Sequence, residues 1–452
     1  MKVAVIGTGY VGLVTGVSLA VLGHRVMCIG RNKQKIEEIN KGKSPFYEPG
    51  LDSLIKKYRG KNLLQATDDM LTAVKDSDIV IIAVGTPTVN NKLDLAQIKT
   101  ATTQIGKLLK KSNKYKVIVV KSTVVPTTTE SVVLTLLEKF SGKKIGEFGL
   151  CMNPEFLREG NAVEDAINPD RIVIGAIDKK SGLFLRKLYN KVHCPVIITN
   201  LRTAELIKYT SNALLATMIS YSNEISRIAE DIGKIDIVDV WEAVHLDRRL
   251  SPIVDGKRIT PMFLSYIYSG CGYGGSCFPK DTKALASFAK SKKINVKIID
   301  AVIDINKTQP QRVLGLLKNS LGSLRGKTIA VLGLAFKPDT DDMRESPSVA
   351  LITELKNAGA HVRVTDPKTY NANKKFIDNL GVRFESTISS VLKQVDAAVV
   401  MTAWGEYKKI SPRIFKEYMK NPVLVDSRRI YKKSLMEKEG IIYNGIGLSG
   451  GI

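Results

Sequence analysis

The sequence is poor in the residues that build metal sites and disulfide frameworks. It holds four histidines and only five cysteines, at irregular spacing: Cys28, Cys151, Cys194, Cys271 and Cys277. An odd number of cysteines without a repeating pattern argues against a disulfide scaffold and fits a reducing compartment, so we expect a cytoplasmic protein. Because no Cys or His spacing matches a zinc site, we expect no metal.

Aromatic residues are also scarce, at 6%, although the formal net charge is +24. The lysines are scattered in short runs such as KKYRGK (56–61) and SKKINVK (291–297). Proteins that bind single-stranded nucleic acid combine a basic groove with aromatic stacking residues. We therefore expect a lysine-rich solvated surface and no nucleic-acid partner. A nucleic-acid-binding protein is the alternative of a different class, and it predicts steeply salt-dependent binding to DNA or RNA.

Charged residues are absent from residues 3–23, VAVIGTGYVGLVTGVSLAVLG, which raises the alternative of a membrane helix. However, Gly7, Gly9 and Gly12 form a G-x-G-x-x-G pattern after the strand-like VAVI, and HRVMCI (24–29) follows at βαβ distance. In this pattern the glycines allow a tight turn, close approach of the backbone to a pyrophosphate, and close packing of helix on strand. A buried βαβ unit explains the whole stretch, so we expect no membrane segment.

Further apolar runs predict the rest of the architecture. Segments 77–87, 115–123 and 148–156 are nearly continuous apolar runs, as in buried parallel strands. Residues 203–233 have helical spacing, and a second helical stretch runs from Asp281 to about 319, broken near QPQ (309–311). Residues 327–335 repeat the theme of residues 2–9, with Ala335 in place of the second glycine. This C-terminal turn should therefore bind something other than the redox cofactor.

The fold class predicted from these patterns is α/β, with two Rossmann-like, doubly wound parallel-sheet domains joined by a long central helix. The expected domains are a dinucleotide-binding domain (1–200), a central helical domain (201–310) and a C-terminal Rossmann-like domain (311–452).

The stretch GCGYGGSCFPKD (270–281) carries the most suggestive chemistry. Lys280 can lower the pKa of the Cys277 thiol, and Asp281 can hold a water or act as a base. Cys271 has no such neighbours, and we expect a packed thiol there. The plainer interpretation is a glycine-rich loop with incidental cysteines.

Two other segments place polar groups where elements meet. In NPEFLREG (153–160), Glu155 and Glu159 are four residues apart and would share a face in a helical turn, although such a pair can simply mark a helix start. Thr123 ends a predicted strand. Lys208 and Asn212 are one helical turn apart, a spacing that alone indicates no more than a solvated face.

Taken together, these motifs resemble the nucleotide-sugar dehydrogenases of the UDP-glucose/GDP-mannose dehydrogenase family over nearly the whole chain. The resemblance also rests on KSPFYEPGL (43–51), VGTP (84–87), KSTVVP (121–126), PDRIVIG (169–175), AELIKYTSNA (204–213) and GLAFKPDTDDMRESPS (333–348). It implies a homodimeric enzyme with two successive hydride transfers to nicotinamide cofactors. A cysteine captures the intermediate aldehyde, and the resulting thioester is hydrolysed to a carboxylate. The FLREG and CFPKD variants favour UDP-glucose as substrate, for polysaccharide synthesis, with GDP-mannose or another nucleotide sugar as alternatives.

The resemblance also assigns residues. It implies catalytic roles for Cys277 as nucleophile, Lys208 and Asn212 at oxyanions, and Asp281, Glu155 and Thr123 at water. The implied cofactor contacts are Gly7, Gly9, Tyr10, Val11, Gly12, Arg31, Thr86, Thr123, Glu159, Lys280 and Arg344. The implied substrate contacts are Glu155, Phe156, Leu157, Glu159, Lys208, Asn212, Arg258, Gly274 and Lys337. Arg258, in RITPMFL (258–264), would come from the neighbouring subunit, with Arg248 and Arg249 as rival assignments.

One position departs from the family pattern. NAD-preferring Rossmann domains usually carry an acidic residue after the second strand, which binds the ribose 2′-hydroxyl. Here Gly30 stands at that place and Arg31 follows. NAD is the cofactor that the family implies, but this pair also suits the 2′-phosphate of NADP. Alternatively, Asn32 or a backbone group serves the hydroxyl and Arg31 stacks on adenine.

Overall fold

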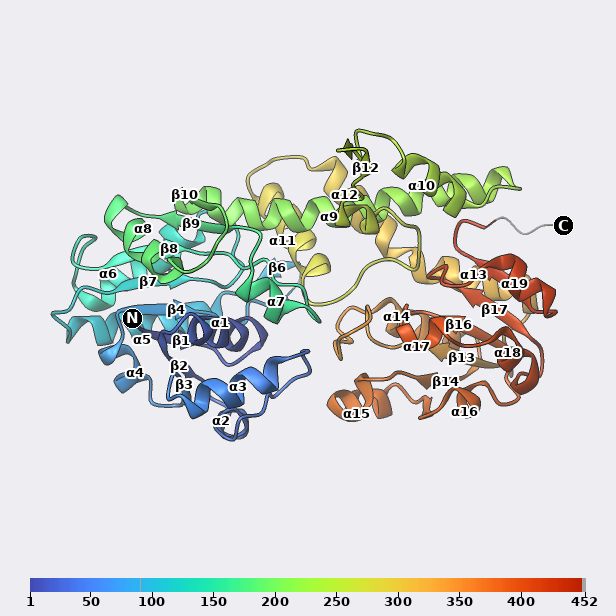
Figure 1. The fold of residues 1–452 in the computed structure, drawn as a ribbon, viewed down its shortest axis with the longest axis horizontal. Helices are drawn as coiled ribbons and strands as arrows, with labels where there is room; N and C mark the ends of the chain where they lie inside the picture. Colours follow the sequence, from blue (N-terminus) through green and yellow to red (C-terminus); the bar gives the residue numbers. More distant parts are fainter. Residues whose placement is uncertain (90, 449–452) are drawn as a thin grey trace. The chain divides into compact units, whose positions relative to one another are not determined.

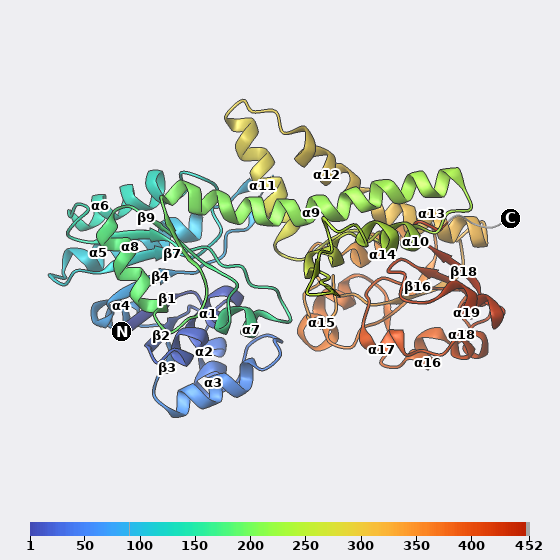
Figure 2. The same ribbon diagram turned by 45° about the horizontal axis from the view of Figure 1, so that its top comes forward.

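The computed structural model describes residues 1–89 and 91–448, and its contacts divide the chain into two units, Met1–Ser211 and Asn212–Ile452. The division falls inside α9 (Leu201–Ile232), which is one continuous helix of 32 residues (Figure 2). Among the described residues, no helix has the length and apolarity that a membrane crossing requires. The uncharged stretch near the start forms β1 and α1 instead. The three-domain division stays a prediction.

The first unit is built on an eight-stranded sheet with the order β10-β9-β8-β7-β4-β1-β2-β3 (Figure 1). Its strands are β1 (Lys2–Ile6), β2 (Arg25–Ile29), β3 (Leu64–Thr67), β4 (Ile79–Ile82), β7 (Val117–Val120), β8 (Gly149–Met152), β9 (Ile172–Ala176) and β10 (Val196–Thr199). Alternate residues of β1 enter two different cores, Val3 and Val5 on one face and Ala4 and Ile6 on the other. Both faces are therefore buried, which explains the continuous apolar runs.

Helices cover both faces of this sheet. One core receives α1 (Tyr10–Val21), α2 (Lys33–Asn40), α3 (Leu51–Gly60), α7 (Ala162–Ile167) and α8 (Lys179–Arg186). The other receives α4 (Met70–Asp76), α5 (Ala96–Lys110), η1 (Thr129–Leu134), α6 (Thr135–Ser141) and the first turns of α9. The sequence segments between the strands supply these layers in the alternating order of a doubly wound fold. A small hairpin, β5 (Thr88–Val89) with β6 (Lys92–Leu93), and the short η2 (Lys187–Tyr189) complete the unit.

One part of the sheet differs from an all-parallel arrangement. The strands from β3 to β8 are parallel, but β9 pairs with β8 in the antiparallel direction, and β10 is parallel to β9. No crossover helix long enough for a parallel connection lies between β8 and β9, since α7 has six residues and packs on α1.

The second unit begins with the remainder of α9 and a helical region. This region contains α10 (Ile237–His245), the hairpin β11 (Ile253–Val254) and β12 (Lys257–Arg258), η3 (Met262–Tyr266), α11 (Phe278–Ser291), α12 (Lys297–Lys307) and α13 (Gln309–Leu321). The break expected near residues 309–311 lies at Thr308, between α12 and α13. The sequence analysis missed a second break at residues 292–296, where Lys293 has a positive φ of 60° and ends the helix.

A second sheet, entirely parallel, has the order β15-β14-β13-β16-β17-β18 (Figure 1). Its strands are β13 (Thr328–Leu332), β14 (His361–Thr365), β15 (Arg383–Phe384), β16 (Ala397–Val400), β17 (Val423–Asp426) and β18 (Ile442–Gly445). One face packs against α13, α14 (Pro347–Asn357) and α15 (Thr369–Asn379). The other packs against α16 (Ile388–Leu392), α17 (Gly405–Lys408), α18 (Pro412–Tyr418) and α19 (Lys433–Lys438). The two βαβ sheets and the long helix predicted from the sequence are confirmed.

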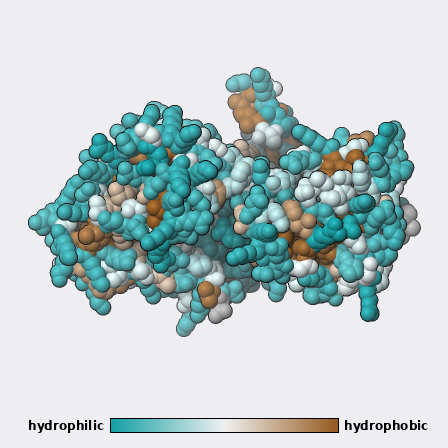
Figure 3. Space-filling model, turned by 90° about the horizontal axis from the view of Figure 1, so that it is seen from below, coloured by the Kyte–Doolittle hydropathy of each residue, from teal (hydrophilic) through white to brown (hydrophobic). Residues whose placement is uncertain are grey.

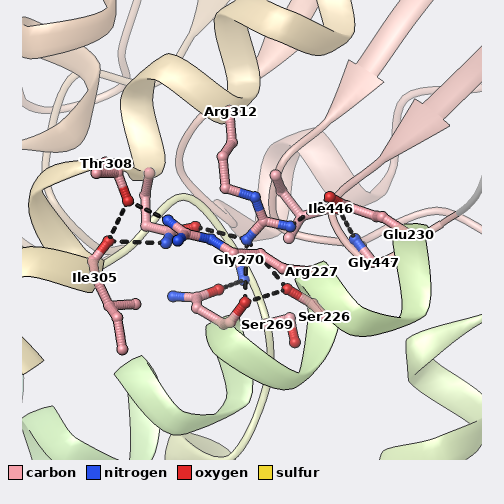
Figure 4. Close-up of polar contacts among 12 residues, drawn as sticks. Ser226, Arg227, Glu230, Ser269, Gly270, Ile305, Thr308, Arg312, Ile446 and Gly447 are labelled. Carbon is pink, nitrogen blue, oxygen red and sulfur yellow. Dashed lines mark hydrogen bonds and ion pairs between the residues drawn. The ribbon is translucent and has the colours of Figure 1, made fainter. Parts of the chain in front are cut away.

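Polar contacts tie this second sheet to the end of α9 (Figure 4). The Glu230 carboxylate accepts hydrogen bonds from the Arg312 guanidinium on α13 at 2.5 Å and from the backbone N–H of Gly447 at 2.6 Å. The same guanidinium donates to the Ser226 hydroxyl at 3.2 Å. The segment after β18 is therefore held to α9 by a charged group rather than by apolar packing alone.

The face shown in Figure 3 is predominantly hydrophilic, with separate small hydrophobic patches. This agrees with scattered lysines on a solvated surface.

Candidate active site

The N-terminal glycine turn joins β1 to α1. Gly7 has a φ of 123°, and a Cβ atom there would lie 2.2 Å from the Ala83 carbonyl oxygen. A Cβ at Gly12 would lie 2.0 Å from the Gly7 oxygen, whereas a Cβ at Gly9 would meet nothing within 4 Å. Only glycine therefore fits at positions 7 and 12, whereas open space lies beside Gly9.

The backbone of this turn offers donors to that space. Within the described chain, no group accepts a hydrogen bond from the N–H of Thr8 or Gly9. Gly9 is also the N-cap residue of α1. Unpaired N–H groups at the start of a helix fit a phosphate group. The residues present therefore fit the pyrophosphate of a dinucleotide.

The C-terminal sheet has the same turn in a closed form. Gly333 has a φ of 102°, but a carboxylate oxygen of Asp366 accepts from the N–H groups of Leu334 at 2.8 Å and Ala335 at 3.0 Å. The same oxygen accepts from the Trp404 indole at 3.2 Å. A negative charge of the protein already satisfies the donors that would face a pyrophosphate. This gives a physical reason for the expectation that this turn does not hold the redox cofactor.

A buried ion pair lies at the start of the NPEFLREG segment. The Lys208 ammonium on α9 lies 3.0 Å from the Glu155 carboxylate, and both side chains are at most 6% exposed. Burial alone would raise the pKa of Glu155, but Lys208, the Leu157 N–H at 2.7 Å and Lys121 together hold that pKa below its ordinary value. Glu155 is therefore a carboxylate at neutral pH.

The helical-turn arrangement expected for this segment is wrong. Residues 153–158 have no regular structure, and only 159 and 160 form a turn before α7. Glu155 and Glu159 therefore do not share a helical face. The Phe156 ring lies between two cations, with the Arg171 guanidinium 3.9 Å and the Lys208 ammonium 5.5 Å from its centroid. Leu157 packs against the core that contains α1.

Lys121 is a residue of this region that the sequence analysis did not single out. Its ammonium is buried and donates to the Asn153 side-chain oxygen at 3.0 Å, and burial lowers the pKa of Lys121 to about 8. It lines a cavity of about 70 Å³ together with Asn153, Glu155, Arg171 and Tyr189. The available signal was a lysine directly after a fully apolar strand, two residues before Thr123.

Glu48, within KSPFYEPGL, is a second such residue. Its carboxylate accepts from the Tyr10 hydroxyl and from the backbone N–H groups of Gly160 and Ala162, both at 2.7 Å. Burial, followed by this hydrogen bond, raises the pKa of Tyr10. Glu48 thereby joins the glycine turn to the loop that carries Glu159. Its position in a motif of the resemblance was the signal that could have identified it.

The other residues of the first unit that are predicted to contact the cofactor lie just after strands or, for Val11, at the start of α1. Thr86 follows β4, and its hydroxyl donates at 3.0 Å to the carbonyl of Thr123, which follows β7. Val11 lies in the first turn of α1, and Arg31 is exposed after β2.

The glycine-rich loop of the second unit is shaped by close packing. A Cβ at Gly274 would lie 2.4 Å from the Glu345 carbonyl oxygen, and one at Gly275 would lie 2.7 Å from the Phe336 ring. The N–H of Gly275 donates to the Arg344 carbonyl at 2.8 Å. The glycines are thus needed because the loop lies directly on the segment that follows β13.

The two thiols of this loop lie in different surroundings. Cys271 is fully buried in the core of the second sheet, as expected for a packed thiol. Cys277 is partly exposed and is the N-cap residue of α11, and its sulfur lies 3.6 Å from the Ser276 hydroxyl. The partial positive charge at a helix N-terminus favours negative charge at such a position.

A buried carboxylate lies one turn after Cys277. Asp281 is 1% exposed, and its N–H donates to the Cys277 carbonyl at 2.8 Å. One carboxylate oxygen accepts from the Asn212 amide at 2.6 Å, and the other pairs with the Lys280 ammonium. Four of the predicted site residues are therefore brought together at the start of α11.

The predicted site residues Arg344, Lys337 and Arg258 each have a local partner of their own in the described structure. Arg344 makes a two-point ion pair with Asp342, with both nitrogen–oxygen distances at 2.8 Å. Lys337 lies 5.8 Å from the centroid of the Phe336 ring. Arg258, in β12, donates to the carbonyls of Leu246 at 2.8 Å and Ser251 at 2.9 Å. Of its rivals, Arg248 is exposed, and Arg249 pairs with Asp247.

Comparison with known proteins gives matches along most of the chain. Residues 1–193 match the NAD binding domain of the UDP-glucose/GDP-mannose dehydrogenase family, residues 202–308 its central domain, and residues 330–433 its UDP binding domain. The chain is 40% identical to the UDP-glucose 6-dehydrogenase TuaD of Bacillus subtilis, over 99% of this chain and 93% of that protein.

Solved structures show the same relationship. A UDP-glucose dehydrogenase from Pyrobaculum islandicum is 37% identical, with a TM-score of 0.89 over 99% of this chain and 98% of that one. A UDP-D-ManNAc dehydrogenase from Pyrococcus horikoshii is 28% identical, with a TM-score of 0.85 over 99% of both chains.

Proposed function

Because the chain belongs to the UDP-glucose/GDP-mannose dehydrogenase family and is an NAD-dependent oxidoreductase, we propose that it oxidises UDP-glucose to UDP-glucuronate. The full-length similarity to UDP-glucose 6-dehydrogenases supports this substrate. The observation that carries the chemistry is the start of α11, where Cys277 stands one turn before the buried Asp281.

The first oxidation converts the C6 alcohol to an aldehyde. The hydroxyl gives up its proton and the carbon a hydride; bound NAD⁺ supplies the hydride acceptor for each oxidation. Lys208 and Asn212 stabilise the oxygen as its negative charge develops. The buried pairing of Lys208 with Glu155 supports a fixed cation in this role.

The second oxidation uses the thiol. The Cys277 sulfur attacks the aldehyde carbon, a C–S bond forms, and the oxygen takes up a proton to give a thiohemiacetal. Loss of that proton and of a second hydride leaves a thioester. Water then attacks the carbonyl carbon, the C–S bond breaks, and the products are a carboxylate and the restored thiol.

Hydrolysis requires a group that accepts a proton from water. We assign this work to Asp281 and Glu155, with Thr123 positioning the water. The depressed pKa of Glu155 supports the assignment, because only the ionised form accepts a proton. The cavity beside Glu155, at about 70 Å³, has room for water.

We also propose a homodimer that shares Arg258 across subunits. On α9, Leu214, Tyr221 and Ile228 recur at seven-residue spacing and are each more than 50% exposed, as is Ile232. An apolar stripe of this kind on a long helix suits a second copy of the same helix.

The substrate assay mixes the protein with UDP-glucose and NAD⁺ and counts the NADH formed per sugar consumed. We expect two, and Cys277→Ala should abolish the second. No NADH with UDP-glucose, but NADH with GDP-mannose or UDP-N-acetylmannosamine, would overturn the proposed substrate. Cys271→Ala is not a suitable control because that thiol is buried in the core; Cys194→Ala, in the first unit, is.

The shared arginine is tested by complementation. Cys277→Ala and Arg258→Ala proteins should each fail to form UDP-glucuronate alone. Up to a quarter of the sites should become active when subunits are exchanged after mild dissociation. Absence of recovery in a preparation shown to contain mixed dimers would contradict a shared site.

A further inference from the structure

Position 30, just after β2, carries glycine instead of an acidic residue, and it has no room for a larger side chain unless Thr8 moves. A Cβ at Gly30 would lie 2.6 Å from the hydroxyl oxygen and 2.9 Å from the methyl carbon of Thr8. Thr8 belongs to the glycine turn and is only 7% exposed. An aspartate at position 30 would therefore require Thr8 to move.

The second sheet has a carboxylate, Asp366, at the place equivalent to Gly30. The Ile29 carbonyl accepts from Gly7 N–H at 2.8 Å, and the Thr365 carbonyl accepts from Gly333 N–H at 2.9 Å. Gly30 and Asp366 follow these two carbonyls, so they occupy equivalent places. The first unit therefore has no carboxylate where NAD-preferring Rossmann domains bind the ribose 2′-hydroxyl.

Two cations follow instead. Arg31 and Lys33 are both exposed, and within the described chain no carboxylate pairs with either. Asn32, between them, is committed to local structure, since its side-chain oxygen accepts from Lys35 N–H at 3.1 Å to begin α2. A guanidinium and an ammonium beside the ribose position match a dianionic phosphate.

The neighbouring strand supplies the closest competing carboxylates. Gly30 N–H donates to the Thr67 carbonyl at the end of β3, and Asp68 and Asp69 follow. Asp69 is occupied as the cap of α4, where it accepts from Thr72 N–H at 3.1 Å. Asp68 is exposed, and it is the residue to test as an alternative partner of the ribose hydroxyl.

We propose that this chain accepts NADP in addition to NAD, with Arg31 as the specificity-determining residue for the 2′-phosphate and Lys33 as its support. The proposal rests on dinucleotide binding by the first unit and not on the identity of the sugar. Failure of the UDP-glucose assay therefore leaves it standing, and its own failure leaves the sugar assignment standing.

Binding of adenosine fragments tests the proposal without catalysis. Calorimetric titration of the full chain with 2′,5′-ADP, 5′-AMP and 5′-ADP, at 50 and 200 mM NaCl, gives the contribution of the 2′-phosphate, because 5′-AMP lacks only that group. We expect 2′,5′-ADP to bind at least as tightly as 5′-AMP. Arg31→Ala should weaken 2′,5′-ADP about tenfold and 5′-ADP less than threefold, because one charge-assisted contact is lost.

Controls separate this contact from general electrostatics. Arg186→Ala removes an exposed arginine of α8 and should change neither affinity. Binding of 2′,5′-ADP more than tenfold weaker than 5′-AMP, or equal losses of 2′,5′-ADP and 5′-ADP binding in Arg31→Ala, would overturn the proposal. So would a loss of 5′-ADP binding in Asp68→Ala that is accompanied by tighter binding of 2′,5′-ADP, since Asp68 would then act as the missing acid.

A reciprocal variant tests the role of Thr8. Thr8→Ala/Gly30→Asp makes room for the carboxylate and should weaken 2′,5′-ADP at least tenfold while retaining 5′-ADP. Thr8→Ala alone, which keeps Gly30, is the reference for the double variant and should not change the ratio of the two dissociation constants. If the double variant binds 2′,5′-ADP as the parent does, position 30 does not control the 2′ position and the proposal is wrong.

Discussion

The side-chain amide of Asn212 donates a hydrogen bond of 2.6 Å to the carboxylate of Asp281, which is 1% exposed. The other carboxylate oxygen pairs with Lys280. Both oxygens of a buried charge are therefore held by named donors, one from α9 and one from its own helix. A carboxylate held at both oxygens keeps a fixed direction, which a role in proton transfer requires.

Asn212→Ala should remove one donor from this buried carboxylate. We expect a loss of about 2 kcal/mol in the free energy of unfolding, because a buried charge loses a hydrogen bond. The turnover number should fall with it. Urea unfolding and steady-state kinetics measure the two effects. The exposed Asn295→Ala, before α12, is the control and should change neither. Unchanged stability in Asn212→Ala would show that water replaces the amide.

Lys208→Met should strongly destabilise the first unit. Glu155 would lose its nearest counter-charge while remaining buried, at a cost of about 3–5 kcal/mol at pH 7. In the parent the pKa of Glu155 is below its ordinary value of 4.5, so this stabilisation is present above pH 4.5 and is lost as the pH falls through the lower folded value. In the variant that pKa rises, so acidification from pH 7 to 5 should narrow the stability difference.

Denaturant unfolding of Lys208→Met at pH 7 and pH 5 checks this prediction. Adding Glu155→Gln should restore part of the lost stability, because the unpaired charge is removed. A gap between parent and Lys208→Met that is equal at both pH values would contradict the assignment of the cost to Glu155.

Glu205 on α9 should make stability fall between about pH 4.5 and pH 7. Its fully buried carboxylate accepts from Thr127 N–H at 2.7 Å and Thr129 N–H at 2.8 Å, yet burial raises the pKa of Glu205 to about 7. A raised folded pKa contributes stability that is complete below the unfolded value of 4.5 and is lost as the pH rises through about 7.

Glu205→Gln tests this pH dependence. The amide does not titrate, so its unfolding free energy should lack a decline of up to about 3 kcal/mol that the parent shows across this range. Urea unfolding at several pH values measures the slope. Glu138→Gln, on α6 and paired with the exposed Lys144, should keep the parental slope, because Glu138 is not among the groups that shift the pKa of Glu205. Equal slopes in the parent and Glu205→Gln would refute the prediction.

Glu48→Gln should weaken the binding of NAD and of the proposed sugar nucleotide. The amide oxygen cannot accept from the Tyr10 hydroxyl and both backbone N–H groups at once. The hydrogen bonds that join the glycine turn to the loop at 159–162 are therefore weakened. We expect dissociation constants for NAD and the sugar nucleotide to rise about tenfold. Tyr10→Phe removes only the hydroxyl and should affect chiefly NAD. Calorimetry on both variants checks this, and parental affinities in Glu48→Gln would exclude an anchoring role.

Local patterns predicted the repeating part of the fold. VAVI and HRVMCI form adjacent parallel strands, as predicted. They were predictable because apolar runs, glycine turns and helical spacing are patterns among residues that are close in the sequence. The direction of β9 was not accessible in this way, since it depends on the short connection through α7 packing against α1. The break at residues 292–296 was not predicted because its lysines favour helices, and nothing in the residue types there indicates the positive φ of Lys293.

The candidate site shows the same limit. Cys277, Asp281 and Lys208 could be named from motifs, because their types and spacing carry chemistry. Glu48 and Lys121 could not be assigned roles in this way, because what distinguishes them is burial against backbone groups far away in the sequence. The helical pairing of Glu155 with Glu159 failed because Glu155 instead pairs with a lysine on another element.

The two glycine turns differ in where their counter-charge comes from. Asp366 neutralises the second turn from within the chain, whereas the donors of Thr8 and Gly9 receive no such charge from the described protein. Part of the first sheet's folding free energy is therefore supplied by whichever anion occupies its turn. At a free concentration one hundred times its dissociation constant, a dinucleotide adds about 2.7 kcal/mol. The total concentration of dinucleotide then sets how long this enzyme survives, whereas only its oxidised fraction sets how fast it works.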